Sequence, residues 1–195
     1  MKKNKNKQAE MLRLFVAIEI SKEIRDSLAA LQEELRITCP EIRWVKPENI
    51  HLTLKFLGNV KEALVPEILH SLSRALLGLD DFVFEVKGTG AFPAEGRPRV
   101  MWVGISQGAD KIFAFHSKIK QALASFDFEE EKNEFAAHLT IGRLKDEVDT
   151  EKLKEMLVLK KDKKFGECAC GHISIIKSDL RPEGPVYTIL EKIKL

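Results

Sequence analysis

The chain has 195 residues, of which 44% are hydrophobic, and a net charge of +2 at neutral pH. This length suits one large domain or one domain built from two similar halves. No apolar run approaches the roughly 20 residues that a membrane-spanning helix needs, and the N-terminus lacks the apolar segment of a secretory signal. We therefore expect a soluble protein of the cytoplasm.

The positive charge is concentrated at the N-terminus. Residues 1–10, MKKNKNKQAE, hold four lysines and one glutamate, which leaves residues 11–195 with a net charge of −1. A broad basic face for nucleic acid is thus excluded, and any contact with nucleic acid must be local. Residues 1–10 are predicted to be a disordered basic tail that aids solubility or is dispensable, with RNA contact as the alternative, and residues 11–195 to be one domain.

The sequence pattern indicates alternating strands and helices. Short β-rich runs predict strands, apolar residues at helical spacing predict helices, and Ser21 and Asp149 or Thr150 are placed to cap two of the helices. Several connections are too short for parallel crossovers, so we expect antiparallel or mixed sheets with helices outside. The predicted strands are 12–20, 42–45, 50–58, 81–90, 99–106, 136–144, 170–180 and 185–195; the predicted helices are 22–36, 62–78, 109–124 and about 150–159.

The tripeptide His-Leu-Thr occurs twice, in HLTLKFLG at 51–58 and in HLTIGRLK at 138–145. On a strand, side chains alternate between faces. His51 and Thr53 then share one face, and His138 and Thr140 share one face of the second strand, while the intervening aliphatic residues point to a core. A single copy would be read as structural, but a repeat in the two halves of the chain favours a function.

Two such units suit acid–base chemistry on a phosphodiester. Imidazole titrates near neutral pH, so one histidine can protonate a leaving oxygen while the other activates water. Threonine hydroxyls can donate to phosphate oxygens, and the arrangement requires no metal and no cofactor. The remaining histidines, His70, His116 and His172, have no repeated partner and are read as structural or surface residues.

The cysteines carry no such pattern. Cys39, Cys168 and Cys170 are odd in number and lack zinc spacing, so they are expected to be reduced thiols, and we assign them no function.

The order of motifs resembles the 2H phosphoesterase superfamily, and within it the RNA 2′,3′-cyclic phosphodiesterases, also described as 2′-5′ RNA ligases. The resemblance covers about residues 11–195: LRLFVAIEI, WVKPENIHLTLKFLGNV, GTGAFP, RPRVMWVGI, FAAHLTIGRLK and SDLRPEGPVYTIL follow the order of the family. Ala137 departs from the proline that many members have before the second motif, which affects how the strand begins rather than the chemistry.

The resemblance implies an α+β, bilobal fold with two antiparallel sheets lining a central cleft and helices outside. It implies hydrolysis of a terminal 2′,3′-cyclic phosphate of RNA to a 2′-phosphomonoester. His51 would be the proton donor, His138 the proton acceptor, and Thr53 and Thr140 the phosphate-binding residues.

Further contacts to RNA are predicted near the motifs. Arg143 has the wrong parity for a flat strand, but can reach phosphate if the strand ends or bulges there. Lys55 shares the face of His51 on a flat strand and would add charge at the cleft rim. Arg97 and Arg99 flank a proline and are either phosphate contacts or plain surface residues.

Two aromatic residues, Phe56 and Trp102, could stack a base, although core packing is the commoner role of strand aromatics.

Other functions remain open at this stage. They are a 2′-5′ RNA ligase acting on RNA ends such as tRNA halves, a small cyclic-nucleotide phosphodiesterase, and a non-catalytic RNA-end-binding protein. The expected partner is an RNA end bearing a 2′,3′-cyclic phosphate, with no membrane and no metal, and the expected state is a monomer.

Overall fold

The structure is a computed structural model that describes residues 10–130, 133–145 and 149–195. The basic tail predicted for residues 1–10 lies, apart from Glu10, outside the described residues, and a single domain over residues 11–195 stays a prediction. None of the helices in the described ranges is both long enough and apolar enough to cross a bilayer.

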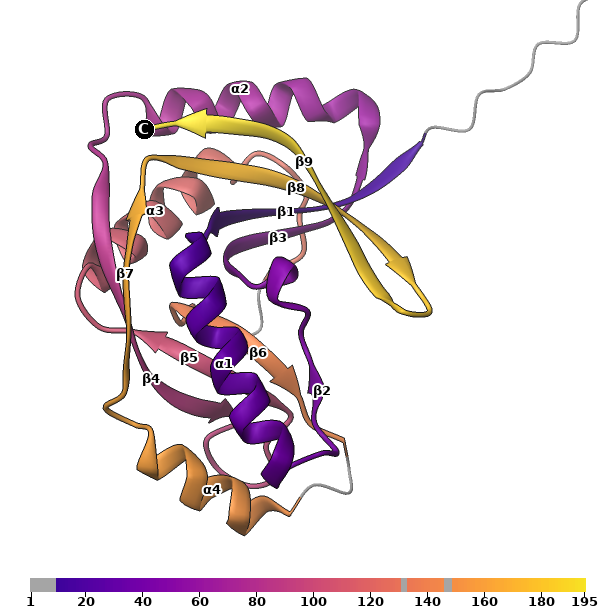
Figure 1. Cartoon of the computed structure of the whole chain (residues 1–195). Helices are drawn as coiled ribbons and strands as arrows, with labels where there is room; N and C mark the ends of the chain where they lie inside the picture. The colour runs from indigo at the N-terminus through magenta and orange to yellow at the C-terminus, as the bar shows by residue number, and fades with distance from the viewer. Residues whose placement is uncertain (1–9, 131–132, 146–148) are drawn as a thin grey trace, which may run out of the picture.

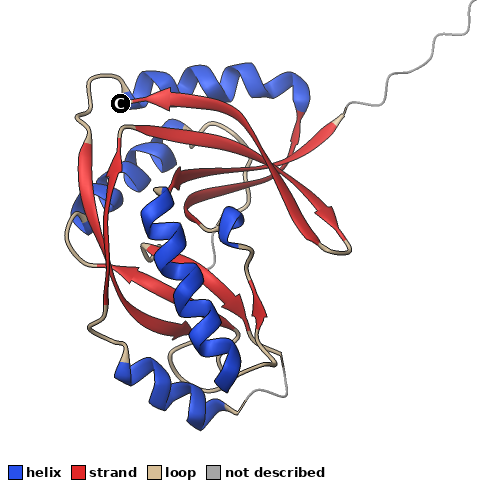
Figure 2. Cartoon of the chain, viewed as in Figure 1, coloured by secondary structure: helices blue, strands red, loops and turns tan. Residues whose placement is uncertain are grey.

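Four α-helices of the described residues lie on the outside of a curled sheet (Figures 1 and 2). The cap residues act as the sequence indicates: Ser21 Oγ accepts from the backbone N–H of Ile24, and Asp149 accepts from Glu151 and Lys152. The α-helices are α1 (Lys22–Thr38), α2 (Val65–Leu76), α3 (Ala109–Ala122) and α4 (Thr150–Leu159), with 3-10 turns η1 (Pro47–Asn49) and η2 (Glu62–Leu64).

Nine strands within these ranges form one hydrogen-bonded sheet in the order β7-β4-β5-β6-β3-β1-β8-β9, with β2 paired to β6, and each of these pairings is antiparallel. The strands are β1 (Met11–Glu19), β2 (Arg43–Trp44), β3 (His51–Lys61), β4 (Phe82–Phe92), β5 (Val100–Ile105), β6 (His138–Arg143), β7 (Lys164–Cys170), β8 (His172–Arg181) and β9 (Gly184–Lys194).

The sheet has two halves that meet between β3 and β6. Among the described residues, Leu52 and Leu139 are the only partners in this pairing, whereas β1 and β3 pair over nine residues of β1. Figure 1 shows α1 lying across the β5–β6 half, while α2 and α3 lie with the β1–β3–β8–β9 half. The expected α+β fold is confirmed, with the two predicted sheets joined edge to edge by this one pair.

Two details differ from the sequence-based expectation. β7 (Lys164–Cys170) was not predicted, because two of its exposed positions are charged and one is glycine, which hides the alternation; only Phe165, Cys168 and Cys170 are buried. The helix predicted over 62–78 begins instead as the 3-10 turn η2, and its α-helical part is Val65–Leu76. Neither change moves a His-Leu-Thr motif off its strand.

The buried aliphatic residues form one large core between the helices and the sheet. It includes Leu52 and Leu54 from β3 and Leu139 and Ile141 from β6, together with apolar residues of α1, α2 and α3. The residues that follow each motif histidine are therefore anchored in the core, which leaves the opposite face of both strands for other side chains.

We predict unequal costs for alanine at two glycines of positive φ, Gly58 within β3 and Gly108 at the N-cap of α3. Gly58 and Gly108 have φ values of 68° and 76°, which disfavour a side chain. A Cβ on Gly58 would meet nothing within 4 Å, whereas one on Gly108 would lie 2.6 Å from the carbonyl oxygen of Val83. Gly58→Ala should cost about 1–2 kcal/mol of unfolding free energy, and Gly108→Ala clearly more, as measured by urea unfolding. Equal costs would contradict the close approach.

Candidate active site

The Leu52–Leu139 pair places the two His-Leu-Thr motifs side by side. The strands are antiparallel at this point. His51 therefore lies on the side of Thr140, and Thr53 lies on the side of His138. Both leucines are fully buried in the core, so the two histidines and two threonines share the opposite face. The predicted facing arrangement of the four residues follows from this register.

A β-bulge interrupts the alternation of β3 just after Thr53. Ala17 pairs with Thr53 but Val16 pairs with Lys55, so Leu54 and Lys55 together oppose Val16. Phe15 then pairs with Phe56, which is 55% exposed and whose ring centroid lies 6.1 Å from that of Phe15. The bulge brings Phe56 onto the face of His51 and Thr53.

The same irregularity occurs at the matching place in β6. Trp102 pairs with Thr140 and Met101 pairs with Gly142, so Ile141 is the additional residue. A Cβ on Gly142 would lie 2.7 Å from Ile42, a core residue, which shows that Gly142 faces the core. Arg143, the next residue, is exposed on the side of His138 and Thr140. The bulge that Arg143 needs in order to lie on the face of His138, which the sequence alone did not decide, is therefore present.

The flat-strand prediction for Lys55 is wrong. Lys55 is only 8% exposed and opposes Val16, a member of the main core, because the bulge turns it away from the face of His51. The backbone position of Lys55 therefore faces the core, and contact of its ammonium group with RNA stays a prediction.

Each motif histidine is fixed by a hydrogen bond to its own chain. His51 Nδ1 lies 2.8 Å from the carbonyl oxygen of Asn49, and His138 Nδ1 lies 2.7 Å from the carbonyl oxygen of Ala136. A carbonyl oxygen can only accept, so Nδ1 carries the proton in both rings. Nε2 is then the nitrogen that gains or loses a proton, and this is the same in the two motifs.

Aromatic rings hold and bury the two imidazoles. The His51 ring stacks on Phe15 with centroids 4.7 Å apart and meets Tyr187 edge-on at 5.3 Å. The ring of His138 meets Phe92 edge-on at 5.1 Å. Phe15, Phe92 and Tyr187 were not singled out in the sequence; Tyr187 is the only tyrosine of the chain, but nothing in its spacing links it to either motif.

Burial shifts both histidines in the same direction. Burial lowers the pKa of His51 to about 4, with the nearby charge of His138 lowering it further and the bond to Asn49 opposing the change. Burial also lowers the pKa of His138, against the bond to Ala136. In the ligand-free protein both rings are therefore mainly neutral at neutral pH.

Groups that suit a phosphate surround the histidines. Thr53 and Thr140 are half-buried, and within the described residues no other side chain or backbone group engages their hydroxyls. Burial raises the pKa of Tyr187, while the charges of Arg143 and Arg13 oppose that shift, so both guanidinium groups act on the ring that meets His51 edge-on. Arg13 was not predicted.

The other predicted contacts lie around the β4–β5 connection. Arg97 and Arg99 are exposed there, and the carbonyl oxygen of Arg99 accepts from Leu144, which holds the connection beside the end of β6. Trp102 lies against Gly90 and its ring centroid is 5.2 Å from that of Phe92. These residues border the half-site of His138, and their contact with RNA stays a prediction.

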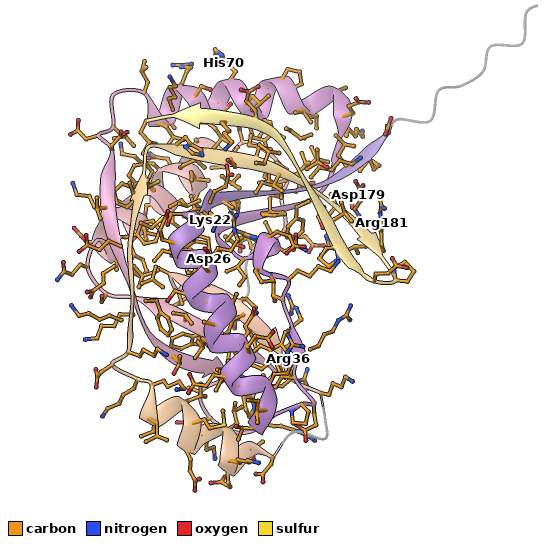
Figure 3. The ribbon with its side chains drawn as sticks, viewed as in Figure 1. Lys22, Asp26, Arg36, His70, Asp179 and Arg181 are labelled. Carbon is orange, nitrogen blue, oxygen red and sulfur yellow. The ribbon has the colours of Figure 1, made fainter. Side chains whose placement is uncertain are left out.

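The remaining histidines lie elsewhere. Figure 3 shows His70 pointing outward from α2, where it is exposed. His116 stacks on Phe135, and His172 binds Glu19, which also accepts from Ser174 and Lys192. In the parts of the chain that the structure describes, no three His, Cys, Asp or Glu side chains come together as a metal site requires. The three cysteines are free and buried.

Comparison with known proteins agrees with this geometry. The model of the family described as LigT like Phosphoesterase matches the chain twice, over residues 18–102 and 103–187. The chain is a member of this phosphoesterase family. The double match corresponds to the two motifs, because each matched half contains one His-Leu-Thr.

Several relatives of the chain are named RNA 2′,3′-cyclic phosphodiesterase. The chain is 35% identical to an RNA 2′,3′-cyclic phosphodiesterase of Methanocaldococcus jannaschii, over 93% of this chain and 99% of that protein. It is 36% identical to one of Thermotoga maritima, over 92% and 93%. Among solved structures, TT0787 of Thermus thermophilus superposes with a TM-score of 0.81 at 28% identity, covering 94% of this chain and 98% of that one.

A phosphate anion should raise both histidine pKa values. Burial holds them below 6.5 in the ligand-free protein because it disfavours the charged ring. An anion between the rings favours the imidazolium form and acts in the opposite direction. NMR titration of the imidazole signals with and without inorganic phosphate measures the change. Titration of His51 near 6.5 without phosphate, or no upward shift with it, would contradict this account.

Proposed function

We propose that this phosphoesterase hydrolyses the terminal 2′,3′-cyclic phosphate of RNA to a 2′-phosphomonoester. The observation that carries the proposal is the pair of imidazoles, each with Nδ1 bonded to a backbone carbonyl and Nε2 left for proton transfer. The names of the relatives give the substrate class, and the threonine hydroxyls and Arg143 supply groups that suit a phosphate.

In the proposed reaction His138 is the proton acceptor and His51 the proton donor. His138 Nε2 takes a proton from water as its oxygen forms a bond to phosphorus. The bond between phosphorus and the ribose 3′ oxygen breaks, and His51 Nε2 gives its proton to that oxygen. The product has a 2′-phosphomonoester and a free 3′ hydroxyl, and the two rings exchange protonation states, which solvent restores before the next turnover.

Substrate binding has to prepare the donor. Because burial lowers the pKa of His51 to about 4 in the ligand-free protein, its protonated form is scarce at neutral pH. The negative charge of the bound phosphodiester stabilises the imidazolium in a site with little water. The same burial makes protonated His51 a strong acid once it is formed, which favours transfer to a poor leaving oxygen.

The residues around the two histidines would hold the terminal nucleotide in one orientation. Thr53 and Thr140 would donate to the non-bridging oxygens, and Arg143 would add a cation on the side of His138. Phe56 offers an exposed aromatic face on the side of His51 on which the terminal base would stack. A location in the cytoplasm, as expected from the sequence, belongs to this proposal.

Leaving-group chemistry should distinguish the two histidines. Alanine at His51 or His138 should each reduce hydrolysis of an RNA 2′,3′-cyclic phosphate by roughly 10²–10⁴-fold. A phosphodiester with an activated phenolate leaving group needs little protonation. His51→Ala should therefore recover much of its rate on that substrate, whereas His138→Ala should not, because water still lacks its base.

His70→Ala is the matched control, since this exposed histidine of α2 lies outside the site. The reverse pattern of rescue would exchange the two roles. Binding of the RNA end without turnover by the unmodified protein would instead indicate a non-catalytic RNA-end-binding protein. Formation of a 2′-5′ linkage between RNA ends as the main product would indicate a ligase.

Hydrolysis should be independent of divalent metal. The proposed steps use only the two imidazoles and neutral or cationic hydrogen-bond donors, so excess EDTA should leave the rate of cyclic phosphate hydrolysis unchanged. Loss of activity with EDTA and its return with one divalent ion would overturn the two-histidine mechanism.

A further inference from the structure

The β8–β9 hairpin reaches beyond the ladder that holds it to the sheet. β1 pairs with β8 only from Ser174 to Lys177, whereas β8 and β9 remain paired as far as Arg181 and Gly184. The distal part of the hairpin projects from the sheet in Figure 1, and it bears Asp179 and Arg181 in Figure 3. Strand pairing with β1 alone does not fix the position of this distal part.

Asn49 joins the distal hairpin to the motif histidine. Its side-chain Nδ2 donates to the carbonyl oxygen of Pro185 at 2.9 Å, across 136 residues of sequence. Its own carbonyl oxygen accepts from His51 Nδ1 at 2.8 Å. One residue therefore binds the hairpin with its side chain and the imidazole with its backbone.

The hairpin in turn forms part of the surroundings of His51. Tyr187, two residues after Pro185 on β9, meets the His51 ring edge-on and lies 5.1 Å from Phe15, on which that ring stacks. A shift of the hairpin at Pro185 would move Tyr187 relative to the imidazole. The burial of His51 thus depends on where this segment is held.

We propose that Asn49 is a positioning residue that fastens the β8–β9 hairpin against His51 and so completes the wall of the active site. The inference rests on the proposed function only in taking His51 as a reacting group. The side chain of Asn49 is not needed for its own turn, because η1 is closed by backbone bonds from Asn49 N–H to Lys46 and from Ile50 N–H to Pro47. Its amide is left to serve the hairpin.

Asn49→Ala tests the fastening without substrate. Loss of the bond to Pro185 should let water reach the ring, and the pKa of His51, about 4 in the intact protein, should rise toward 6.5. The other ionisable groups around it are unchanged: His138 in the second motif, Glu19 opposite His51 on β1, Tyr187 on β9, and Arg13 and Arg143 near Tyr187. NMR titration measures the shift, with the His51 signal assigned from a His51→Gln variant.

Asn59→Ala is the matched control. Asn59 is an exposed residue of β3, and within the described residues its side chain makes no hydrogen bond. It should leave the pKa of His51 and the rate of hydrolysis unchanged. Asn49→Ala should reduce kcat by roughly 10–10²-fold, the scale expected for a misplaced reacting group.

A double-mutant cycle shows whether Asn49 acts through the hairpin. Tyr187→Leu removes the aromatic contact, and if Asn49 works by placing Tyr187, the double variant should lose less than the product of the two single losses in kcat. If the two single losses in kcat multiply in the double variant, or if the pKa of His51 is unchanged in Asn49→Ala, the proposal is overturned. A lower stability of Asn49→Ala would not rescue it. A shifted pKa with no hydrolysis by the unmodified protein would support the fastening and count against the proposed function.

Discussion

The backbone pairing of Leu52 with Leu139 is the constraint on which the site depends. It is the only partnership between β3 and β6 in the described part of the chain, and each leucine sits between the histidine and the threonine of its motif. Because strand side chains alternate, a slip of one residue would place the leucines on the face of the site and the imidazoles in the core. Two fully buried leucines therefore specify the register of four polar side chains.

Around this junction the protein holds its histidines by backbone and aromatic contacts. Carboxylate partners would raise the imidazole pKa values and favour the charged form. Carbonyl acceptors also fix the tautomer, but they raise the pKa much less. Phe15, Tyr187 and Phe92 then restrict the rings and exclude water. Both rings remain sensitive to an anion that enters between them, so the ligand itself supplies the charge that the site lacks.

The sequence predicted the motif residues because their meaning depends only on strand alternation and repetition. His51, Thr53, His138 and Thr140 needed no knowledge of tertiary structure beyond two strands that meet. Lys55 and Arg143 needed more, since a bulge after each threonine reverses the parity of the later residues in the strand. A bulge depends on the partner strand and leaves no clear mark in a single sequence.

Contacts between distant segments were equally out of reach. Asn49 and Pro185 are 136 residues apart, and Tyr187 reaches His51 only because β8 and β9 fold back beside β1. Strand β7 was missed for a different reason, as its exposed charged residues conceal a short buried stripe. The helix caps at Ser21 and Asp149, in contrast, are local signals and were predicted correctly.

The matching bulges bear on the origin of the two halves of the chain. A chain whose halves share a motif, a bulge and a family match is most simply the product of an ancient duplication, and its ancestor would have joined two identical half-sites. Such a symmetric site accepts a substrate equally well in two opposite directions. The third position after each threonine is occupied by Phe56 in one half and by Arg143 in the other, so the two half-sites of this chain are no longer identical.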